Sequence, residues 1–174
     1  MAIVFFIFLL LSVYSYAFFP LLLWILKGVL ARPWKQGPAI YSVSIIISVH
    51  NEEKVIQAKI ENALALDYPG DLLEIIVSSD GSTDNTHEIA SRFKDSGVIV
   101  KTFDRLGKTE CLNRTIGHAK GEIILFTDAN SIFPPDLLKN IAGNFVDPDI
   151  GLVTGWTKYL KADGGQDVTG IYAK

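Results

Sequence analysis

The pattern of hydrophobic positions divides the chain into one uninterrupted apolar run and a longer segment in which short apolar stretches alternate with polar ones. Between Met1 and Leu30 the only charged residue is Lys27. A helix that crosses the hydrocarbon core of a membrane needs about 20 apolar residues, and its backbone groups must be hydrogen-bonded to one another. Residues 1–30 are therefore predicted to form a transmembrane helix, with room for tilt around Pro20.

A cleaved signal peptide is the alternative interpretation of this run. It would need a positively charged start, a shorter apolar core and small residues at a cleavage site. No Lys or Arg precedes the run, which is also too long, and the sequence Leu30-Ala31-Arg32 is a poor cleavage site. These features favour a retained membrane anchor.

The residues around the end of the apolar run predict its orientation. Lys27, Arg32 and Lys35 lie together at this end, and Trp24 and Trp34 flank it as interfacial anchors. An excess of positive charge marks the cytoplasmic side of a membrane span. We therefore expect a single-pass membrane protein in this chain, with its N-terminus outside, the following domain in the cytoplasm and membrane lipid as a partner.

Beyond the anchor, apolar stretches of strand length alternate with stretches of helical periodicity. Residues 42–49 form a nearly continuous β-branched run, which is typical of a strand buried on both faces. Further strands are expected at 73–78, 98–103, 122–127 and near 152–156, and helices at 53–66, 82–93, 108–119 and 135–145. This alternation predicts an α/β fold with a mostly parallel, Rossmann-like sheet and helices on both of its faces.

Composition adds limits on domains and partners. Residues 31–41, which contain Pro33, Gly37 and Pro38, are predicted to link the anchor to one domain over residues 42–174. The net charge of −3, without a basic face, argues against nucleic acid as a partner. The single cysteine, Cys111, excludes a disulfide within the chain, agrees with a reducing compartment and is predicted to pack inside a helix.

The polar residues capable of chemistry gather where the predicted strands end. They occupy residues 48–53, 79–82, 104–108 and 127–130. In an open parallel sheet, ligands bind outside the carboxyl ends of the strands, at a point where the strand order reverses. These segments are therefore predicted to form the ligand site.

Asp128 and Asn130 follow the strand expected at 122–127. Alternate residues of an extended segment point the same way, so both side-chain oxygens can converge on one hard cation. Mg²⁺ or Mn²⁺ held by one or two protein oxygens, with diphosphate and water completing the shell, fits this pattern. An Asx turn into the next helix is equally compatible with these residues.

Other candidate residues carry weaker signals. The carboxylate of Asp80 can accept hydrogen bonds from a base or a ribose, although helix capping is an alternative for which Ser82 is better placed. Lys108, after Gly107 and near Arg105, could meet phosphates, although a solvated surface lysine is the default. His50, taken alone, is more typical of a structural or exposed histidine.

Together these motifs resemble the family 2 glycosyltransferases of GT-A fold, over about residues 41–160. The segments that carry the resemblance are residues 43–53, 74–84, 107–108, 112–113, 119–122 and 127–130. With the anchor, the chain is similar to membrane-anchored polysaccharide synthases, which favours a UDP-sugar donor. An NAD-dependent dehydrogenase is disfavoured, because no Gly-x-Gly-x-x-Gly follows the first strand.

The resemblance implies a role for each matching residue in binding a nucleotide-sugar donor. The positions that it implies line the nucleobase are Ser48, His50 and Glu52. Asp80 would bind the base or the ribose, and Lys108 would lie near the diphosphate. Asp128 and Asn130 would face the metal, Mg²⁺ or Mn²⁺, which neutralises charge on the departing nucleoside diphosphate.

The chain also departs from the family pattern. Ser79 stands where the family often has a first aspartate, His50 replaces a more usual aromatic residue, and Asn130 replaces the second aspartate of an Asp-x-Asp pair. The catalytic base of family members lies in the acceptor-binding half, which is expected beyond Lys174. Asp163 and Asp167 are the only late carboxylates that could replace it.

Two functions are compatible with these observations. The first is a metal-dependent inverting glycosyltransferase that moves a sugar from a nucleotide-sugar to a glycan or lipid-linked acceptor at the cytoplasmic membrane face. The second is a fragment or regulatory remnant, truncated before the acceptor half, that binds the nucleotide-sugar without transferring it. The motifs favour the first function for a longer parent protein.

Overall fold

The computed structural model describes residues 1–174 except 31, 156–158, 161–165 and 168–174. The chain forms two compact units, Met1–Lys35 and Gln36–Lys174. The second unit holds two sheets, one of four strands and one of two short strands, β5 (Tyr159–Leu160) and β6 (Gln166–Asp167). Asp163 and the side chain of Asp167, the two late carboxylates named above, lie outside the described residues.

The first unit is one continuous helical run made of α1 (Ala2–Val13), a π-helical turn η1 (Tyr14–Phe18) and α2 (Phe19–Leu30). Proline has no N–H to continue the α-helical hydrogen bonds, and the π-helical turn lies just before Pro20. The run spans 29 residues, and its most apolar stretch of 18 residues has a mean hydropathy of 2.3. It is long and apolar enough to cross a membrane, a property that it shares with signal sequences.

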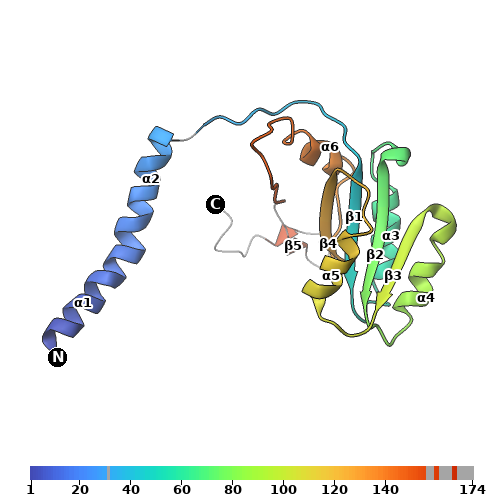
Figure 1. Cartoon of the computed structure of the whole chain (residues 1–174), viewed down its shortest axis with the longest axis horizontal. Coiled ribbons are helices and arrows are strands. Elements are labelled where there is room, and N and C mark those ends of the chain that lie inside the picture. Colours follow the sequence, from blue (N-terminus) through green and yellow to red (C-terminus); the bar gives the residue numbers. More distant parts are fainter. Residues whose placement is uncertain (31, 156–158, 161–165, 168–174) are drawn as a thin grey trace. The chain divides into compact units, whose positions relative to one another are not determined.

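Four parallel strands form the sheet of the second unit (Figure 1). They are β1 (Val43–Val49), β2 (Leu73–Asp80), β3 (Val98–Phe103) and β4 (Ile123–Asp128), in the order β3-β2-β1-β4. The strand order reverses at β1, which pairs with β2 on one side and with β4 on the other. The predicted α/β fold with a mostly parallel sheet is confirmed.

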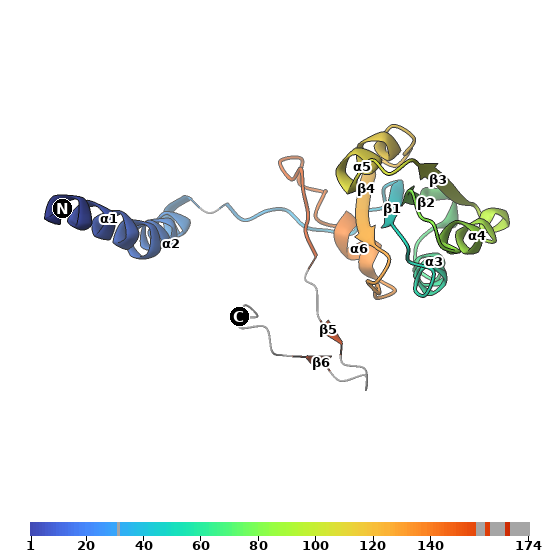
Figure 2. The ribbon, with the colours of Figure 1, turned by 90° about the horizontal axis from the view of Figure 1, so that it is seen from below.

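Helices cover both faces of this sheet, as Figure 2 shows. Helix α5 (Lys108–Ile116) lies on one face, and α3 (Ile56–Leu64), α4 (Thr86–Ser91) and α6 (Leu137–Ala142) lie on the other. Short 3-10 turns, η2 (Gly70–Leu72) and η3 (Lys94–Ser96), precede β2 and β3. The helices are shorter than their apolar periodicity predicts, because turns such as the one from Glu52 to Val55 take up their ends.

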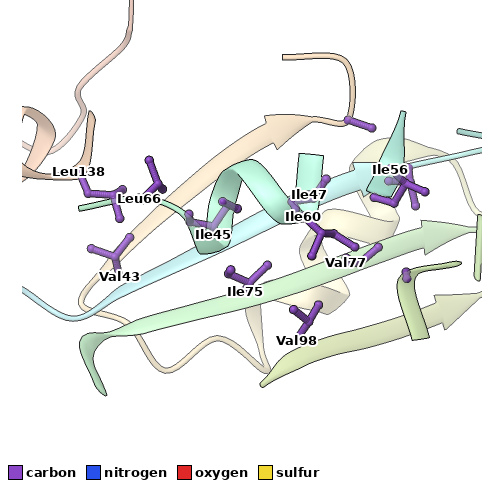
Figure 3. Close-up of a cluster of buried hydrophobic side chains, with 14 of the residues drawn as sticks. Val43, Ile45, Ile47, Ile56, Ile60, Leu66, Ile75, Val77, Val98 and Leu138 are labelled. Atoms are coloured by element: carbon purple, nitrogen blue, oxygen red, sulfur yellow. The ribbon is translucent and has the colours of Figure 1, made fainter. Parts of the chain in front are cut away.

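The core lies between the sheet and the three-helix face. Figure 3 shows Ile45 and Ile47 of β1 in one buried cluster with Ile56 and Ile60 of α3. All four side chains are fully buried, and burying an isoleucine contributes about 1.5–3 kcal/mol. Both faces of β1 are covered, which accounts for its continuous β-branched sequence.

The strand expected near residues 152–156 is wrong for the described residues. Residues 151–155 have no regular structure, and Leu152 is 86 % exposed. Trp156 lies outside the described residues. In the described part of the sheet, β4 is an edge strand, and residues 151–155 do not pair with it.

Candidate functional site

The carboxyl ends of the sheet strands surround a pocket of about 360 Å³. Its lining consists of Ser48, Val49, His50, Glu52, Asp80, Arg105, Gly107, Lys108, Asp128 and Asn130. Every residue that the sequence suggested for binding the nucleotide-sugar or the metal is in this set. The parallel register explains the convergence, because β1 pairs Ser48 with Ser78 of β2 and with Asp128 of β4.

Asp80, the last residue of β2, holds the loop that follows β3 through hydrogen bonds. Its side-chain oxygen Oδ1 accepts hydrogen bonds from the backbone N–H groups of Leu106 at 2.8 Å and Gly107 at 3.0 Å. The guanidinium of Arg105 lies 3.9 Å from Oδ2. Asp80 does not act as a helix cap, and at 5 % exposure it is a buried carboxylate at the floor of the pocket.

Three residues that follow strands of the sheet have a positive φ. Asn51 after β1 has a φ of 55°, Gly81 after β2 has 63°, and Gly107 after β3 has 88°. A Cβ on Gly81 would come within 3.0 Å of the Arg105 backbone nitrogen, so only glycine fits this approach. Asn51 connects the loop after β1 to the loop after β2, since its Oδ1 accepts a hydrogen bond from the Thr83 N–H at 2.8 Å.

His50 is oriented by the backbone of β2. Its Nδ1 lies 2.8 Å from the carbonyl oxygen of Asp80. A carbonyl oxygen only accepts hydrogen bonds, so Nδ1 carries the proton, and in the neutral ring Nε2 is left as an acceptor. The amide nitrogen of Asn51 lies 3.4 Å from Nε2. Although His50 gives a weak signal in the sequence, the structure places it in the pocket wall.

Lys108 and Asp128 face each other across the pocket. The Lys108 ammonium donates to the Asp128 carboxylate at 2.5 Å, and both side chains are more than half exposed. Lys108 is the first residue of α5, where backbone N–H groups have no partner within the helix. An anionic group that enters the pocket would therefore meet both the ammonium and the start of a helix.

The sequence suggests only two residues, Asp128 and Asn130, for a metal ion. Among the described residues no cluster of three or more His, Cys, Asp or Glu side chains could hold a metal ion. Asp128 and Asn130 line the same pocket and offer one carboxylate and one amide oxygen. These are ligands that Mg²⁺ and Mn²⁺ accept, with the remaining positions filled from outside the protein.

Sequence reasoning missed Lys59, a lysine of α3 that is only 2 % exposed. Its ammonium donates to the carbonyl oxygen of Ser131 at 2.9 Å and to Oγ of Ser131 at 3.0 Å. It also lies 3.3 Å from the centroid of the Phe133 ring. Burial lowers the pKa of Lys59 to about 8, although the nearby Asp128 carboxylate acts to raise it.

Helical spacing could have revealed this lysine. Lys59 shares the buried face of α3 with Ile56, Ile60 and Ala63. A charged residue on an apolar face requires a partner. Cys111, by contrast, packs as expected: it is buried, its sulfur lies 3.1 Å from Oγ of Ser78, and burial raises the pKa of its thiol.

Comparison with known proteins shows that this chain is similar to glycosyltransferases. Residues 44–171 match the family described as "Glycosyl transferase family 2". The chain is 32 % identical over 114 residues to the β-monoglucosyldiacylglycerol synthase of Synechocystis, and 33 % identical over 116 residues to the poly-β-1,6-N-acetyl-D-glucosamine synthase of Staphylococcus aureus. These matches cover 63 % and 65 % of this chain but only 24 % and 28 % of the relatives. The chain thus spans about a quarter of their length.

Solved structures of similar fold include proteins with bound donors. The mannosyltransferase PcManGT from Pyrobaculum calidifontis, solved with GDP-Man and Mn²⁺, has a TM-score of 0.68 and 31 % identity, covering 82 % of this chain and 44 % of its own. TarS 1-349 of S. aureus, solved with UDP-GlcNAc, has a TM-score of 0.52 and 27 % identity, covering 58 % of this chain and 30 % of its own. From the family match and these neighbours, the chain belongs to glycosyl transferase family 2.

Proposed function

We propose that the chain carries the donor-binding domain of a metal-dependent inverting glycosyltransferase. It would move a sugar from a nucleotide-sugar, favoured as a UDP-sugar, to a glycan or lipid-linked acceptor. The convergence of every suggested site residue on one pocket carries this proposal. The bound GDP-Man of PcManGT and the bound UDP-GlcNAc of TarS support a nucleotide-sugar as the ligand.

The pocket offers separate surfaces for the parts of such a donor. Ser48, His50 and Glu52 would contact the nucleobase. Asp80 would contact the base or ribose through Oδ2, because Oδ1 already holds two backbone N–H groups. Lys108 would leave its ion pair with Asp128 to meet the diphosphate, which carries more charge.

The residues at the end of β4 fit a divalent cation that is shared with the donor. Asp128 supplies an anionic oxygen and Asn130 a neutral one, so the donor diphosphate must add charge and ligands for tight binding. Mg²⁺ or Mn²⁺ bound there supplies Lewis-acid stabilisation of the departing nucleoside diphosphate. The Mn²⁺ in the PcManGT complex supports this choice of metal.

Residues outside the proposed donor-binding domain would complete the reaction. Inverting transfer needs a base that removes the proton of the acceptor hydroxyl, and we place that base in the acceptor-binding half of the parent protein. We propose residues 1–30 as a transmembrane anchor, 31–41 as a linker and 42–174 as the donor-binding domain at the cytoplasmic face. The apolar helix and the basic residues Lys27, Arg32 and Lys35 support this arrangement.

Titration of Mn²⁺ with and without UDP tests the proposal. If the metal is shared, UDP and Mn²⁺ must strengthen each other's binding by the same factor. In the purified full chain in detergent, Asp128→Ala is expected to abolish this coupling. Asn130→Asp is expected to raise the affinity for Mn²⁺ in the absence of nucleotide, because it adds a second carboxylate.

GDP serves as the comparison nucleotide in the same titrations. A preference for UDP over GDP is expected if the donor is a UDP-sugar. If neither nucleotide changes the affinity for Mn²⁺, residues 128–130 are not a working metal site, and the Asx-turn interpretation replaces it.

A further inference from the structure

Helix α3 holds the segment that follows β4 through two polar side chains on one face. The Lys59 ammonium donates to both the carbonyl oxygen and the hydroxyl of Ser131. One turn along, Asn62 exchanges two hydrogen bonds with the backbone of Phe133: its Nδ2 donates at 3.0 Å and its Oδ1 accepts at 2.8 Å. The segment is thus fixed at two points, and the first lies one residue after Asn130.

The Ser131 hydroxyl extends this attachment to the metal-binding pair. The hydroxyl donates a hydrogen bond to the carbonyl oxygen of Asp128, 3.0 Å from Oγ, and its Oγ lies 2.7 Å from the hydroxyl oxygen of Thr127. The turn from Asp128 to Ser131 is therefore closed by the Ser131 hydroxyl, which in turn is held by Lys59. Ala129 faces inward at 4 % exposure, while Asp128 and Asn130 line the pocket.

Burial of a lysine ammonium costs free energy, so a lysine at this position indicates a role that an apolar residue cannot fill. The neighbours of Lys59 on α3, Ile56 and Ile60, are fully buried in the core. A leucine or methionine would fill the same space without removing an ammonium from water. The ammonium instead has two oxygen acceptors on Ser131 and the face of the Phe133 ring, which offset part of the cost of its burial.

We propose that Lys59 is a positioning residue, which holds residues 128–131 so that Asp128 and Asn130 present their oxygens together to the cation and donor diphosphate. The inference rests on the proposed function, because it assigns Lys59 to the same site. Lys59 itself does not line the pocket, and its ammonium donates to Ser131. Groups behind metal ligands commonly fix ligand orientation in this way.

Replacing Lys59 with a neutral residue distinguishes a positioning role from a purely electrostatic effect on the cation. Lys59 and Asp128 lie close enough for the carboxylate to affect the pKa of the lysine. If Lys59 acted only as a nearby positive charge, its loss would strengthen the binding of a divalent cation. If Lys59 positions the ligands, its loss weakens that binding. The two roles therefore predict changes of opposite sign.

The experiment measures the affinity for Mn²⁺ at saturating UDP, using the full chain in detergent. Lys59→Met keeps an unbranched side chain that lacks only the terminal atom of lysine, and it removes the donors. We expect it to weaken Mn²⁺ binding by about 10-fold to 100-fold, the range found for groups behind metal ligands, and to leave metal-free UDP binding unchanged. Ser131→Ala removes one acceptor from the other side of the same contact and is expected to give a smaller loss of the same sign.

Two matched controls accompany these variants. Lys54→Met removes a positive charge from an exposed position close to α3, and Ile60→Val removes one methylene from the core face of the same helix. Neither is expected to change Mn²⁺ binding, although Ile60→Val lowers the melting temperature. Tighter or unchanged Mn²⁺ binding in both Lys59→Met and Ser131→Ala would overturn the positioning role. A wild-type chain in which UDP and Mn²⁺ do not couple would overturn the proposed function as well.

Discussion

At the scale of single residues, Asp80 combines a structural and a binding role in one carboxylate. One of its oxygens holds the backbone N–H groups of Leu106 and Gly107, and the other faces Arg105 at 3.9 Å. The sequence predicted its place at a strand end but not its partners, because those N–H groups belong to a loop 26 and 27 residues away. Long-range backbone partners of this kind leave no trace in local sequence patterns.

A pair of substitutions at Asp80 separates its roles. Asp80→Ala leaves two backbone donors unpaired and is expected to weaken UDP binding by about 1–3 kcal/mol. Asp80→Asn keeps an oxygen acceptor for the loop and is expected to cost less. Calorimetric titration of both variants provides the measurement. Equal UDP affinity in Asp80→Ala and the wild type would show that this carboxylate does not support nucleotide binding.

Lys59 predicts a dependence of stability on pH. Its pKa is lowered by burial to about 8 in the folded chain, against 10.5 for a free lysine. Between these values the unfolded chain binds more protons than the folded chain, so the free energy of unfolding rises with pH. The penalty for burying the ammonium is fully present below pH 8 and is relieved as pH rises toward 10.5.

Denaturant unfolding of the wild type and Lys59→Met at about pH 7 and about pH 10 checks this sign. The wild type is expected to gain stability relative to Lys59→Met at the higher pH. Lys54→Met, which removes an exposed lysine, is expected to follow the wild type. A constant difference between wild type and Lys59→Met at both pH values would contradict the lowered pKa.

At the scale of elements, apolar patterning predicted the strands better than the helix ends. The four parallel strands lie where continuous apolar runs place them. Helix α3 begins later than the pattern suggests, because the Val55 and Ile56 N–H groups bond to the Glu52 carbonyl in a preceding turn. The sequence also did not predict that Lys59 and Asn62 of α3 hydrogen-bond to Ser131 and Phe133, because a lysine in a helical pattern usually faces solvent.

Gly121, in the turn before β4, lets the chain pass close to the backbone of β1. Gly121 donates its N–H to Oγ of Ser44 at 2.8 Å, and a Cβ on it would lie 2.4 Å from the backbone nitrogen of Ser44. Gly121→Ala is therefore expected to destabilise the domain by about 1–3 kcal/mol, the usual range for overpacking. Thermal unfolding gives the measurement.

Gly151→Ala is the matched control for that substitution, because nothing lies within 4 Å of its added Cβ. It is expected to leave the melting temperature unchanged. Equal melting temperatures for Gly121→Ala and Gly151→Ala would mean that the close contact with Ser44 does not constrain the pairing of β1 and β4.

At the scale of the whole molecule, the division into Met1–Lys35 and Gln36–Lys174 separates an apolar helix from the sheet domain. In the mature protein we expect residues 1–30 to be retained, which mass measurement of the membrane-extracted chain checks. In inverted vesicles, added protease is expected to digest the sheet domain, because the basic residues after the helix favour a cytoplasmic domain. Protection of the domain in these vesicles would reverse the orientation.

The three residues of positive φ that follow β1, β2 and β3 have a consequence for the kinetics of ligand capture. Asn51, Gly81 and Gly107 set the paths of their loops through backbone conformation, and Asn51 is further held by Thr83. The conformational entropy of these loops is therefore lost when the chain folds, not when a nucleotide arrives. Preorganised sites bind without a slow ordering step, so the association rate should depend on diffusion and on the charges of Lys108 and Arg105, and should fall with ionic strength.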